Sequence, residues 1–428
     1  MHLKFLLIAG GALLSATAVQ AGGFQVTLAG QKNNGMGGVG TGLALDHAAM
    51  FYNPGALAMV RERGVQIGVN ATMARQAFRA EAAGTNYDTN QRQLDNTVTT
   101  PFNLYAGFGP TEGKWRAGIA VYTPFGSKLD YADGWEGRFS LTEIDLASIF
   151  VQPTASYAIT DKLSVGAGLV IFAYGAVNLQ RDIPVQSPNG AGQFGHIELD
   201  GKADTKIGYN AGVYFKPTDK LSLGLSYRSK IDAVVKGGDV TFTNLPSSPL
   251  IASNFGATKF DVLLPLPATF NLGIGVTPTE KLTVGFDVNY TQWSEYEKLE
   301  FTFDQPVAGA TTSSSVRDYE NSFTFRLGGQ YQLMDALTLR AGGIYDISPV
   351  KDGYVTPETP DANRVGVSAG LSYKFGEKFG IDLSGQFVSL QERTQTQQQL
   401  IDNNVTDRVA GTYKTSIVIP GIGLNYNF

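Results

Sequence analysis

The chain has 428 residues and a formal net charge of −5, because 38 aspartate and glutamate residues outnumber 33 lysine and arginine residues. No block of basic residues stands out, which argues against a nucleic-acid partner, and the absence of cysteine excludes disulfides, thiolate metal sites and cysteine nucleophiles. The 51 glycines, 25 phenylalanines and 19 tyrosines, with only 17% charged residues, favour strands and turns over helices.

The first 21 residues have the pattern of an export signal. Met1 to Lys4 form a short basic start, Phe5 to Leu14 form an apolar core, and Val19-Gln20-Ala21 fits a signal-peptidase site. The apolar core is too short for a membrane anchor, which needs ~20 apolar residues. We therefore predict a cleaved signal peptide at 1–21 and a mature chain that begins near Gly22.

Residues 22–63 differ from the rest of the chain because they show no regular alternation. They include Gly35-Met36-Gly37-Gly38-Val39-Gly40, which spells a dinucleotide-binding fingerprint. That fingerprint requires a preceding strand and a following helix in a βαβ unit, and the sequence predicts neither. A backbone that turns tightly in a confined space explains the glycines better, because glycine adopts positive φ readily.

From about residue 64 onward the dominant hydrophobic period is two. In Leu221 to Arg228, Leu282 to Thr291 and Ile422 to Phe428, apolar residues alternate with small or polar ones. Such alternation places one strand face in an apolar medium and the other in a polar one. It predicts fourteen strands, near 65–79, 98–109, 115–125, 147–159, 162–181, 203–217, 220–237, 260–278, 281–303, 317–333, 336–347, 363–375, 379–396 and 411–428.

The connections between these strands alternate in length. Every second one is short, as in Thr160-Asp161-Lys162 and Pro217-Thr218-Asp219-Lys220, and the others are long. Short turns at one end and long loops at the other are typical of bacterial outer-membrane barrels, and in lipid an open sheet edge would leave backbone groups unpaired. We therefore predict an all-β fold, a transmembrane antiparallel barrel over residues 64–428 in the outer membrane of a Gram-negative bacterium.

The third predicted strand contains a break. It alternates well up to Thr123 and then meets Pro124, Phe125 and Gly126. Proline has no N–H for the ladder and glycine adds backbone freedom, so pairing should fail locally. We expect the strand to bend inward just after Tyr122 and to leave a gap in the wall. The alternative is that the strand ends there and its loop begins.

Catalytic and metal chemistry has few candidates. After the predicted signal the sequence holds two histidines, His47 and His196, which cannot make up a metal site or a hydrolytic triad by themselves. We expect no cofactor and no metal. A lipid-modifying barrel enzyme stays open as an alternative function.

An ordered series of segments resembles the FadL family of long-chain fatty acid and aromatic hydrocarbon transporters. Gly23-Phe24-Gln25 follows the signal, and Asn53-Pro54-Gly55 stands where the family has Asn-Pro-Ala. Pro124-Phe125-Gly126, Trp135-Glu136-Gly137-Arg138-Phe139 and Ser348-Pro349-Val350 also occur in the family's order, so the resemblance covers nearly the whole mature chain. It implies that residues 22–63 form a hatch that plugs the fourteen-stranded barrel.

The family places an apolar ligand pocket between hatch and barrel wall. On this resemblance Phe24 lies close to the pocket, and Asp346 is an inward acidic residue near it. Arg181 is similar in place to the family's binding arginine, although its odd number directs it toward lipid unless a bulge intervenes. The family's lysine before strand ten corresponds to Glu320 or is displaced to Arg317, which leaves a neutral hydrocarbon as an alternative to a carboxylate.

The resemblance implies passive uptake in which a hydrophobic molecule enters the pocket and leaves sideways through the kinked third strand. Two alternatives stay open: a FadL-like barrel in protein secretion or protein interaction, and the lipid-modifying enzyme. We expect a monomer in contact with outer-membrane lipids. The C-terminal Phe428, with Tyr426, Leu424 and Ile422, is expected to be the signal that the barrel-assembly machinery binds.

Overall fold

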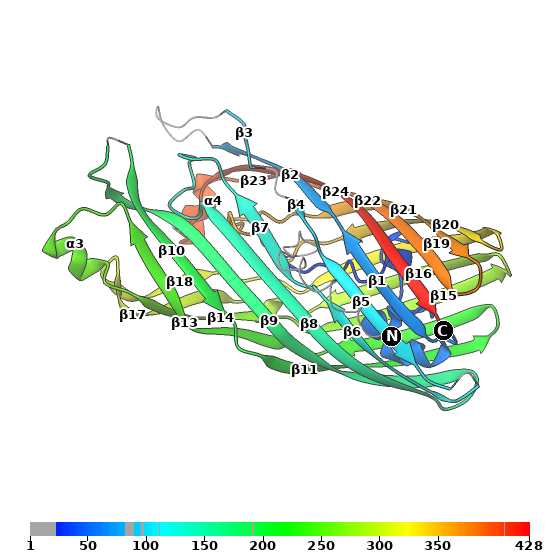
Figure 1. Cartoon of the computed structure of the whole chain (residues 1–428). Helices are drawn as coiled ribbons and strands as arrows, with labels where there is room; N and C mark the ends of the chain where they lie inside the picture. Colours follow the sequence, from blue (N-terminus) through cyan, green and yellow to red (C-terminus); the bar gives the residue numbers. More distant parts are fainter. Residues whose placement is uncertain (1–22, 82–89, 96–97, 111, 191, 406) are drawn as a thin grey trace, which may run out of the picture.

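The computed structural model describes residues 23–81, 90–95, 98–110, 112–190, 192–405 and 407–428, and the signal peptide predicted at 1–21 lies outside these residues. The described chain forms one closed antiparallel β-barrel that is elongated along its axis (Figure 1). None of the helices in these ranges has the length and apolar character that a membrane span requires.

Fourteen wall strands, numbered here in chain order, build the barrel, which confirms the predicted fold. Wall strand 1 consists of β1 (Gly64–Asn70) and β2 (Thr72–Ala80), and wall strand 2 of β3 (Arg92–Gln93), β4 (Val98–Thr99) and β5 (Phe102–Phe108). Wall strand 3 consists of β6 (Trp115–Tyr122) and β7 (Gly126–Asp130), wall strand 4 is β8 (Glu143–Ala158), and wall strand 5 is β9 (Leu163–Gln186). Wall strand 6 consists of β10 (Phe194–Lys202) and β11 (Lys206–Thr218), wall strand 7 of β12 (Leu221–Arg228) and β13 (Ile231–Thr243), and wall strand 8 of β14 (Lys259–Leu266) and β15 (Thr269–Thr279). Wall strand 9 consists of β16 (Leu282–Thr291) and β17 (Lys298–Val307), and wall strand 10 of β18 (Ala310–Val316) and β19 (Ser322–Met334). Wall strand 11 is β20 (Leu337–Asp346) and wall strand 12 is β21 (Arg364–Phe375). Wall strand 13 consists of β22 (Phe379–Leu390) and β23 (Arg393–Gln395), and wall strand 14 is β24 (Gly411–Asn427).

The first and last wall strands close the barrel. β1 pairs with β5 on one edge and with β24 on the other, where Gly64 lies opposite Asn427 and Val69 opposite Ile422. The short turns gather at the end of the barrel that carries the C-terminus (Figure 1). The long connections, with the short helices α3 (Pro249–Asn254) and α4 (Gln397–Asp402), lie at the other end, which in outer-membrane barrels is the extracellular one.

The repeated threonine in the short turns has a structural reason. Thr160 Oγ1 accepts hydrogen bonds from the backbone N–H groups of Lys162 and Leu163, and Thr218 Oγ1 accepts one from that of Lys220. A side chain that accepts hydrogen bonds from the N–H groups of a turn favours one turn geometry. That geometry then sets the register of the two strands that the turn connects.

The upper wall, at the long-loop end, extends further than predicted, and its apolar face is reversed. Parts of the predicted loops at 182–202, 238–259 and 304–316 belong instead to β9, β10, β13, β17 and β18. In the lower wall, Ile207 and Tyr209 of β11 are 68% and 54% exposed on the outer face, whereas in the upper wall Ile197 and Leu199 of β10 are 1% and 4% exposed on the inner face. We infer that lipid surrounds the lower wall and water the upper wall.

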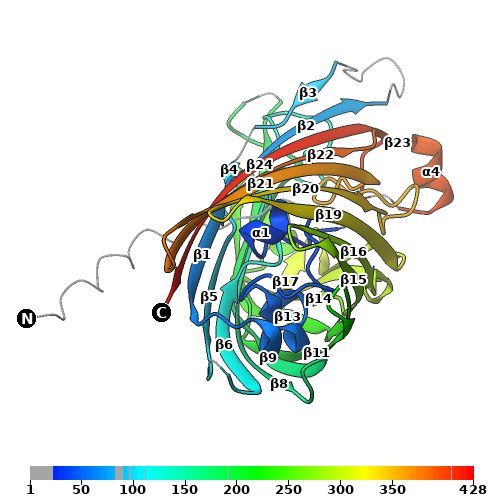
Figure 2. The same ribbon diagram turned by 90° about the vertical axis from the view of Figure 1, so that its right-hand side faces the viewer.

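Residues 23–63, the N-terminal segment, lie inside the barrel and are drawn in blue within the ring of strands (Figure 2). They contain α1 (Gln31–Asn34), α2 (Ala49–Tyr52) and the 3-10 helix η1 (Pro54–Met59), whereas the 3-10 helix η3 (Trp293–Glu295) lies between β16 and β17. The domain boundaries at residues 22, 63 and 64 stay predictions.

The N-terminal segment touches the wall through inward glycines. At each of them an added Cβ would come within 3.0 Å of an atom of the segment. They include Gly421 and Gly423 of wall strand 14 and one glycine from each of wall strands 2, 3 and 5 to 12, namely Gly107, Gly118, Gly166, Gly212, Gly224, Gly273, Gly285, Gly328, Gly342 and Gly370. The segment is therefore seated against the wall without large side chains between them at these points.

Candidate functional site: an apolar cavity with a charged end

An apolar cavity of about 90 Å³ lies between the N-terminal segment and the upper wall. Its lining includes Phe24 of the N-terminal segment and, from wall strands 3 to 9, residues such as Phe172, Val235, Leu264 and Phe301. Two serines, a threonine and one glutamate are the polar exceptions. A cavity with such a lining suits an alkyl or aromatic group, and it offers few partners to a polar solute.

Phe24, predicted to lie near the ligand, forms one side of this cavity. Its ring centroid lies 5.1 Å from that of Trp293 and 5.9 Å from those of Phe125 and Tyr296. The contact with Trp293 is edge-to-face, an arrangement that aromatic pairs prefer. The N-terminal segment therefore contributes a positioned apolar wall to the cavity.

A β-bulge turns Arg181 toward the lumen. The register between β8 and β9 shifts beside Ile149, and Ala173 is left as the extra residue of β9. One extra residue exchanges the two faces of a strand. Leu169, before the bulge, is 54% exposed, whereas Leu179, after it, is 8% exposed and lines the cavity. The bulge on which the inward direction of Arg181 depended is thus present.

Arg181 and Arg317 lie at a charged end of the cavity. A second cavity of about 70 Å³ adjoins the apolar one, shares Glu358 with it, and is lined by both arginines and by Asp407. Arg317 forms an ion pair with Glu358 through Nη2. Its Nε and Nη1 have no hydrogen-bond partner within the described residues. Free guanidinium donors beside an apolar surface suit a carboxylate, which accepts charge-assisted hydrogen bonds.

The sequence did not predict two acidic residues of the charged end, Glu358 and Asp407. Arg408 donates through Nη1 to the Asp407 carboxylate at 2.8 Å, and its guanidinium lies 5.6 Å from the Tyr354 ring centroid. Both acidic residues lie outside the strands, where no alternation fixes the direction of a side chain. No sequence signal marked them.

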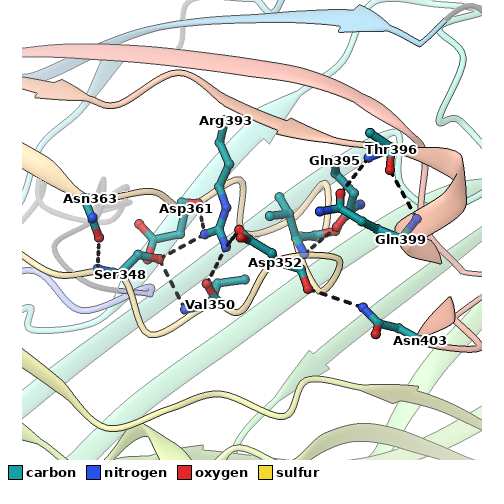
Figure 3. Close-up of polar contacts among 11 residues, drawn as sticks. Ser348, Val350, Asp352, Asp361, Asn363, Arg393, Gln395, Thr396, Gln399 and Asn403 are labelled. Atoms are coloured by element: carbon teal, nitrogen blue, oxygen red, sulfur yellow. Dashed lines mark hydrogen bonds and ion pairs between the residues drawn. The ribbon is translucent and has the colours of Figure 1, made fainter.

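A polar network anchors the loop of residues 347–363, which carries the glutamate of the charged end (Figure 3). Arg393 of β23 donates to the carbonyl oxygens of Val350 and Asp361 at 2.6 and 3.0 Å, and to the Asp352 carboxylate at 2.9 Å. These bonds tie the loop to wall strand 13 and hold it over the cavity.

Asp346, the fourth predicted ligand-binding residue, lies outside the apolar cavity. It lines a separate polar chamber, accepts a hydrogen bond from Thr324 Oγ1 at 2.7 Å, and has Arg364 Nε at 3.6 Å. Glu320, the alternative position for the family's lysine, is exposed and lies 3.8 Å from Lys351 Nζ. The structure thus brings three of the four predicted residues to one site.

Wall strand 3 is interrupted where the sequence predicted a break. β6 ends at Tyr122, and β7 continues the strand from Gly126. The backbone near the break pairs with the N-terminal segment: the Val26 N–H donates to the Pro124 carbonyl at 2.7 Å, and the Gly126 N–H donates to the Phe24 carbonyl at 3.2 Å. The strand therefore neither ends here nor runs straight past the interior.

The ladder between wall strands 2 and 3 stops at the same level. Its last pair includes Tyr122, and above it no ladder joins β7 to wall strand 2 in the part of the chain that the structure describes. The Asp95 N–H donates to the Asp130 carbonyl at 3.1 Å, and Arg92 Nη2 lies 2.9 Å from Glu136 Oε1. Lateral passage at this place stays a prediction.

Residues 12–428 match a family model described as outer membrane protein transport protein (OMPP1/FadL/TodX). The chain belongs to this family. The long-chain fatty acid transport protein of Escherichia coli O6:H1 is 23% identical over 412 residues, with 90% of each chain covered. A Pseudomonas aeruginosa FadL homologue has the same fold, with a TM-score of 0.81 at 21% identity over 95% of this chain and 100% of its own. The toluene transporter TodX of P. putida gives a TM-score of 0.70 at 16% identity, over 93% and 98%.

Membership of the OMPP1/FadL/TodX family confirms the predicted resemblance, the outer-membrane location and the transport function. The members of the family found by these comparisons are transporters or channels rather than enzymes. The family assignment does not decide which residues bind the ligand, so the roles of Phe24, Arg181, Arg317 and Asp346 stay predictions.

The family's Asn-Pro-Ala motif corresponds here to Asn53-Pro54-Gly55, at the start of η1. Asn53 Oδ1 accepts a hydrogen bond from the Gly55 N–H at 3.0 Å, and Asn53 Nδ2 donates to the Val213 carbonyl at 3.0 Å. Pro54 is the first residue of η1, where a missing N–H costs little. A Cβ at Gly55 would lie 2.7 Å from the Gly212 carbonyl oxygen, so this barrel has no room for the family's alanine.

Proposed function

We propose that the protein takes up long-chain fatty acids passively across the outer membrane. The observation that supports this most is the apolar cavity that ends at Arg181 and Arg317. An alkyl chain gains ~0.8 kcal/mol for each CH₂ group that it buries, so binding needs no energy source. The E. coli relative is named a long-chain fatty acid transport protein, which agrees with this ligand class.

Neutral hydrocarbons are a second candidate ligand class. Glu358 pairs with Arg317, and Asp407 lines the same cavity, so part of the positive charge is already compensated. TodX, which shares the fold, is named a toluene transporter. The two classes differ in one testable respect, because only the carboxylate should depend on the arginines.

In the proposed route the ligand enters from the long-loop end, and residues 22–63 act as the hatch. Straight passage is unfavourable, since the N-terminal segment lies across the lumen and the wall around it carries polar side chains. The ligand instead leaves sideways at the break after Tyr122. Before this path opens, the backbone hydrogen bonds that Phe24 and Val26 form with Gly126 and Pro124 have to break.

The cavity can be tested with a residue that fills it. Ala233 lines the cavity, and Ala155 faces outward from the lower wall. Ala233→Trp should lower the affinity of the purified protein for both dodecanoate and dodecane at least tenfold, whereas Ala155→Trp should change neither. Unaltered binding by a folded Ala233→Trp protein would show that the cavity is not the ligand site.

In the proposed function a single barrel transports the ligand and does not change it chemically. Lipid hydrolysis by the purified protein would contradict the second point. Native mass spectrometry would show whether purified barrels carry bound lipid and whether they are single. A protein cargo retained in place of lipid would favour the protein-interaction alternative.

A further inference from the structure

The polar chamber that Asp346 lines has a volume of about 40 Å³ and lies beside a strip of the N-terminal segment, Phe24–Thr27. Phe24 lines the apolar cavity, whereas Gln25 and Thr27 line the chamber. The rest of the chamber consists mostly of hydroxyl, amide and charged side chains of wall strands 7 to 11. One short strip of the N-terminal segment therefore separates an apolar site from a polar one.

Arg228 of β12 connects this chamber with the break in wall strand 3. Its Nη1 donates to the Tyr122 hydroxyl at 2.6 Å, and its Nη2 donates to the Phe51 carbonyl at 3.1 Å. The guanidinium also lies 4.8 Å from the Phe51 ring centroid and 5.5 Å from that of Tyr122. Tyr122 is the last residue of β6, so Arg228 contacts the residue after which the strand leaves its ladder.

The charge of Arg228 is not balanced by an acid. Its hydrogen bonds within the described residues go to neutral oxygens, namely the Tyr122 hydroxyl, the Phe51 carbonyl and the Gln152 side-chain amide at 3.2 Å. A partly buried cation without a counter-charge is unfavourable. An anion that enters the chamber would supply that counter-charge.

The acids near the chamber have their own partners. Asp346 lines it but has Arg364 at 3.6 Å, and Asp287 accepts the backbone N–H groups of Gly40 and Thr41, both at 2.8 Å. Asp287 also lies opposite Arg326 in the ladder between β16 and β19. Neither carboxylate is an ion-pair partner of Arg228.

The chamber offers donors and enough room for a carboxylate. Buried polar atoms of four lining residues have no hydrogen-bond partner within the described residues: Thr41 Oγ1, Tyr52 hydroxyl, Asn289 Oδ1 and Arg326 Nε. Three of these four atoms can donate a hydrogen bond. A volume of about 40 Å³ corresponds to about three water molecules at roughly 10–15 Å³ each, and a carboxylate also has three heavy atoms.

We propose that this chamber is a second headgroup site, in which Arg228 binds the ligand's carboxylate after it leaves Arg181 and Arg317. The proposal rests on the fatty-acid transport proposed above. A carboxylate that moves from the charged end toward the break would otherwise be left in an apolar cavity, which is costly. With its headgroup at Arg228, the alkyl chain can stay in apolar surroundings while it turns toward the gap beside Tyr122.

The test compares uptake of dodecanoate with that of 1-dodecanol, which has the same chain and no charge. Arg228→Met should reduce the rate of dodecanoate uptake about tenfold and leave 1-dodecanol uptake within twofold of wild type. Equilibrium binding of dodecanoate should change little, because the first site is intact. Arg228→Lys, which keeps the charge, should recover most of the dodecanoate rate.

The matched control is Arg340→Met. Arg340 is an inward arginine that donates hydrogen bonds to Gln330 and Ser372 and lines a cavity at the short-turn end. Arg340→Met should therefore change the rates of dodecanoate and 1-dodecanol uptake by the same factor. Heat-modifiability of each barrel reports folding. If Arg228→Met does not assemble, Arg228→Gln against Arg228→Lys provides the same comparison of charge.

Two outcomes would overturn the proposal. Equal loss of dodecanoate and 1-dodecanol uptake would mean that Arg228 only holds Tyr122 and Phe51 in place. Unchanged uptake of both would mean that the headgroup does not use the chamber. Failure of the wild-type protein to bind or take up dodecanoate would instead contradict the proposed function itself.

Discussion

Gly35 of the N-terminal segment and Gly370 of wall strand 12 meet backbone to backbone, so that a Cβ on Gly370 would lie 2.9 Å from the Gly35 Cα. Backbone atoms of the segment would also lie within 3.0 Å of an added Cβ at five other inward glycines, Gly166, Gly224, Gly273, Gly328 and Gly342. Close-packed interiors tolerate little added volume. The segment is therefore held by the shape of its seat as well as by hydrogen bonds.

Gly370→Val should disturb this seat. The added side chain must displace the segment or the wall, at a cost of about 1–3 kcal/mol, so heat modification of the barrel should occur at a lower temperature and the outer membrane should admit more large antibiotics. Gly385→Val is the control, because a Cβ at Gly385 meets no atom within 4 Å. Equal behaviour of the two variants would mean that close packing at Gly370 does not hold the segment.

Arg317 should decide between the two ligand classes. Removing a charge-assisted hydrogen bond costs about 1.5–3 kcal/mol, so Arg317→Met in an E358Q background should lower dodecanoate affinity about 10- to 100-fold. Affinity for dodecane should not change. The E358Q background prevents an unpaired Glu358 from confusing the result, and the exposed Arg75→Met provides the control. Equal dodecanoate affinity of the E358Q protein with and without Arg317→Met would assign the charged end a structural role.

Crosslinking should show whether the strip must move. Gln25 and Phe125 form an isolated antiparallel bridge, whose Cα separation suits a disulfide, and the chain has no cysteine of its own. The oxidised Q25C/F125C protein should lose at least nine-tenths of its uptake, and reduction should restore it. A control pair on the lower wall, A155C/A167C, joins two ladder neighbours and should have no effect. Full uptake by the oxidised Q25C/F125C protein would contradict the proposed path.

The terminal aromatic residue should govern assembly. Phe428 is 56% exposed and donates its backbone N–H to the Arg63 carbonyl at 3.0 Å. Its deletion should lower the amount of heat-modifiable barrel in the outer membrane several-fold, whereas Phe428→Tyr should not. Phe375→Ala removes another exposed aromatic residue at the same end and serves as the control. A normal level after the deletion would argue against a terminal signal.

The lower wall could be predicted because lipid imposes one rule along every strand. The alternation of Leu282 to Thr291 predicted the outward face of β16, and the structure has β16 over the same residues. The upper wall could not be predicted in the same way. Phe194 to Lys202 also alternates, but alternation alone does not say whether the medium outside is lipid or water.

The ligand-site prediction depended on resemblance more than on pattern. Phe24 and Arg317 were located because of what precedes and follows them in the family's order, and both line the site. Glu358 and Asp407 lie on loops, where tertiary contacts set the direction of a side chain, as those of Arg393 do for the loop of residues 347–363. Asp346 was predicted to point inward and does, but it lines the neighbouring chamber.

The extra residue at Ala173 has a consequence for how such a barrel can change during evolution. Below it β9 meets the membrane, and above it the same strand presents Leu179 and Arg181 to the cavity. Loss of this one residue would rotate the upper half of β9 by one pleat and exchange its inner and outer side chains, while the lower half kept its register. Substrate range in this architecture can therefore shift by a single deletion or insertion, without any substitution in the pocket.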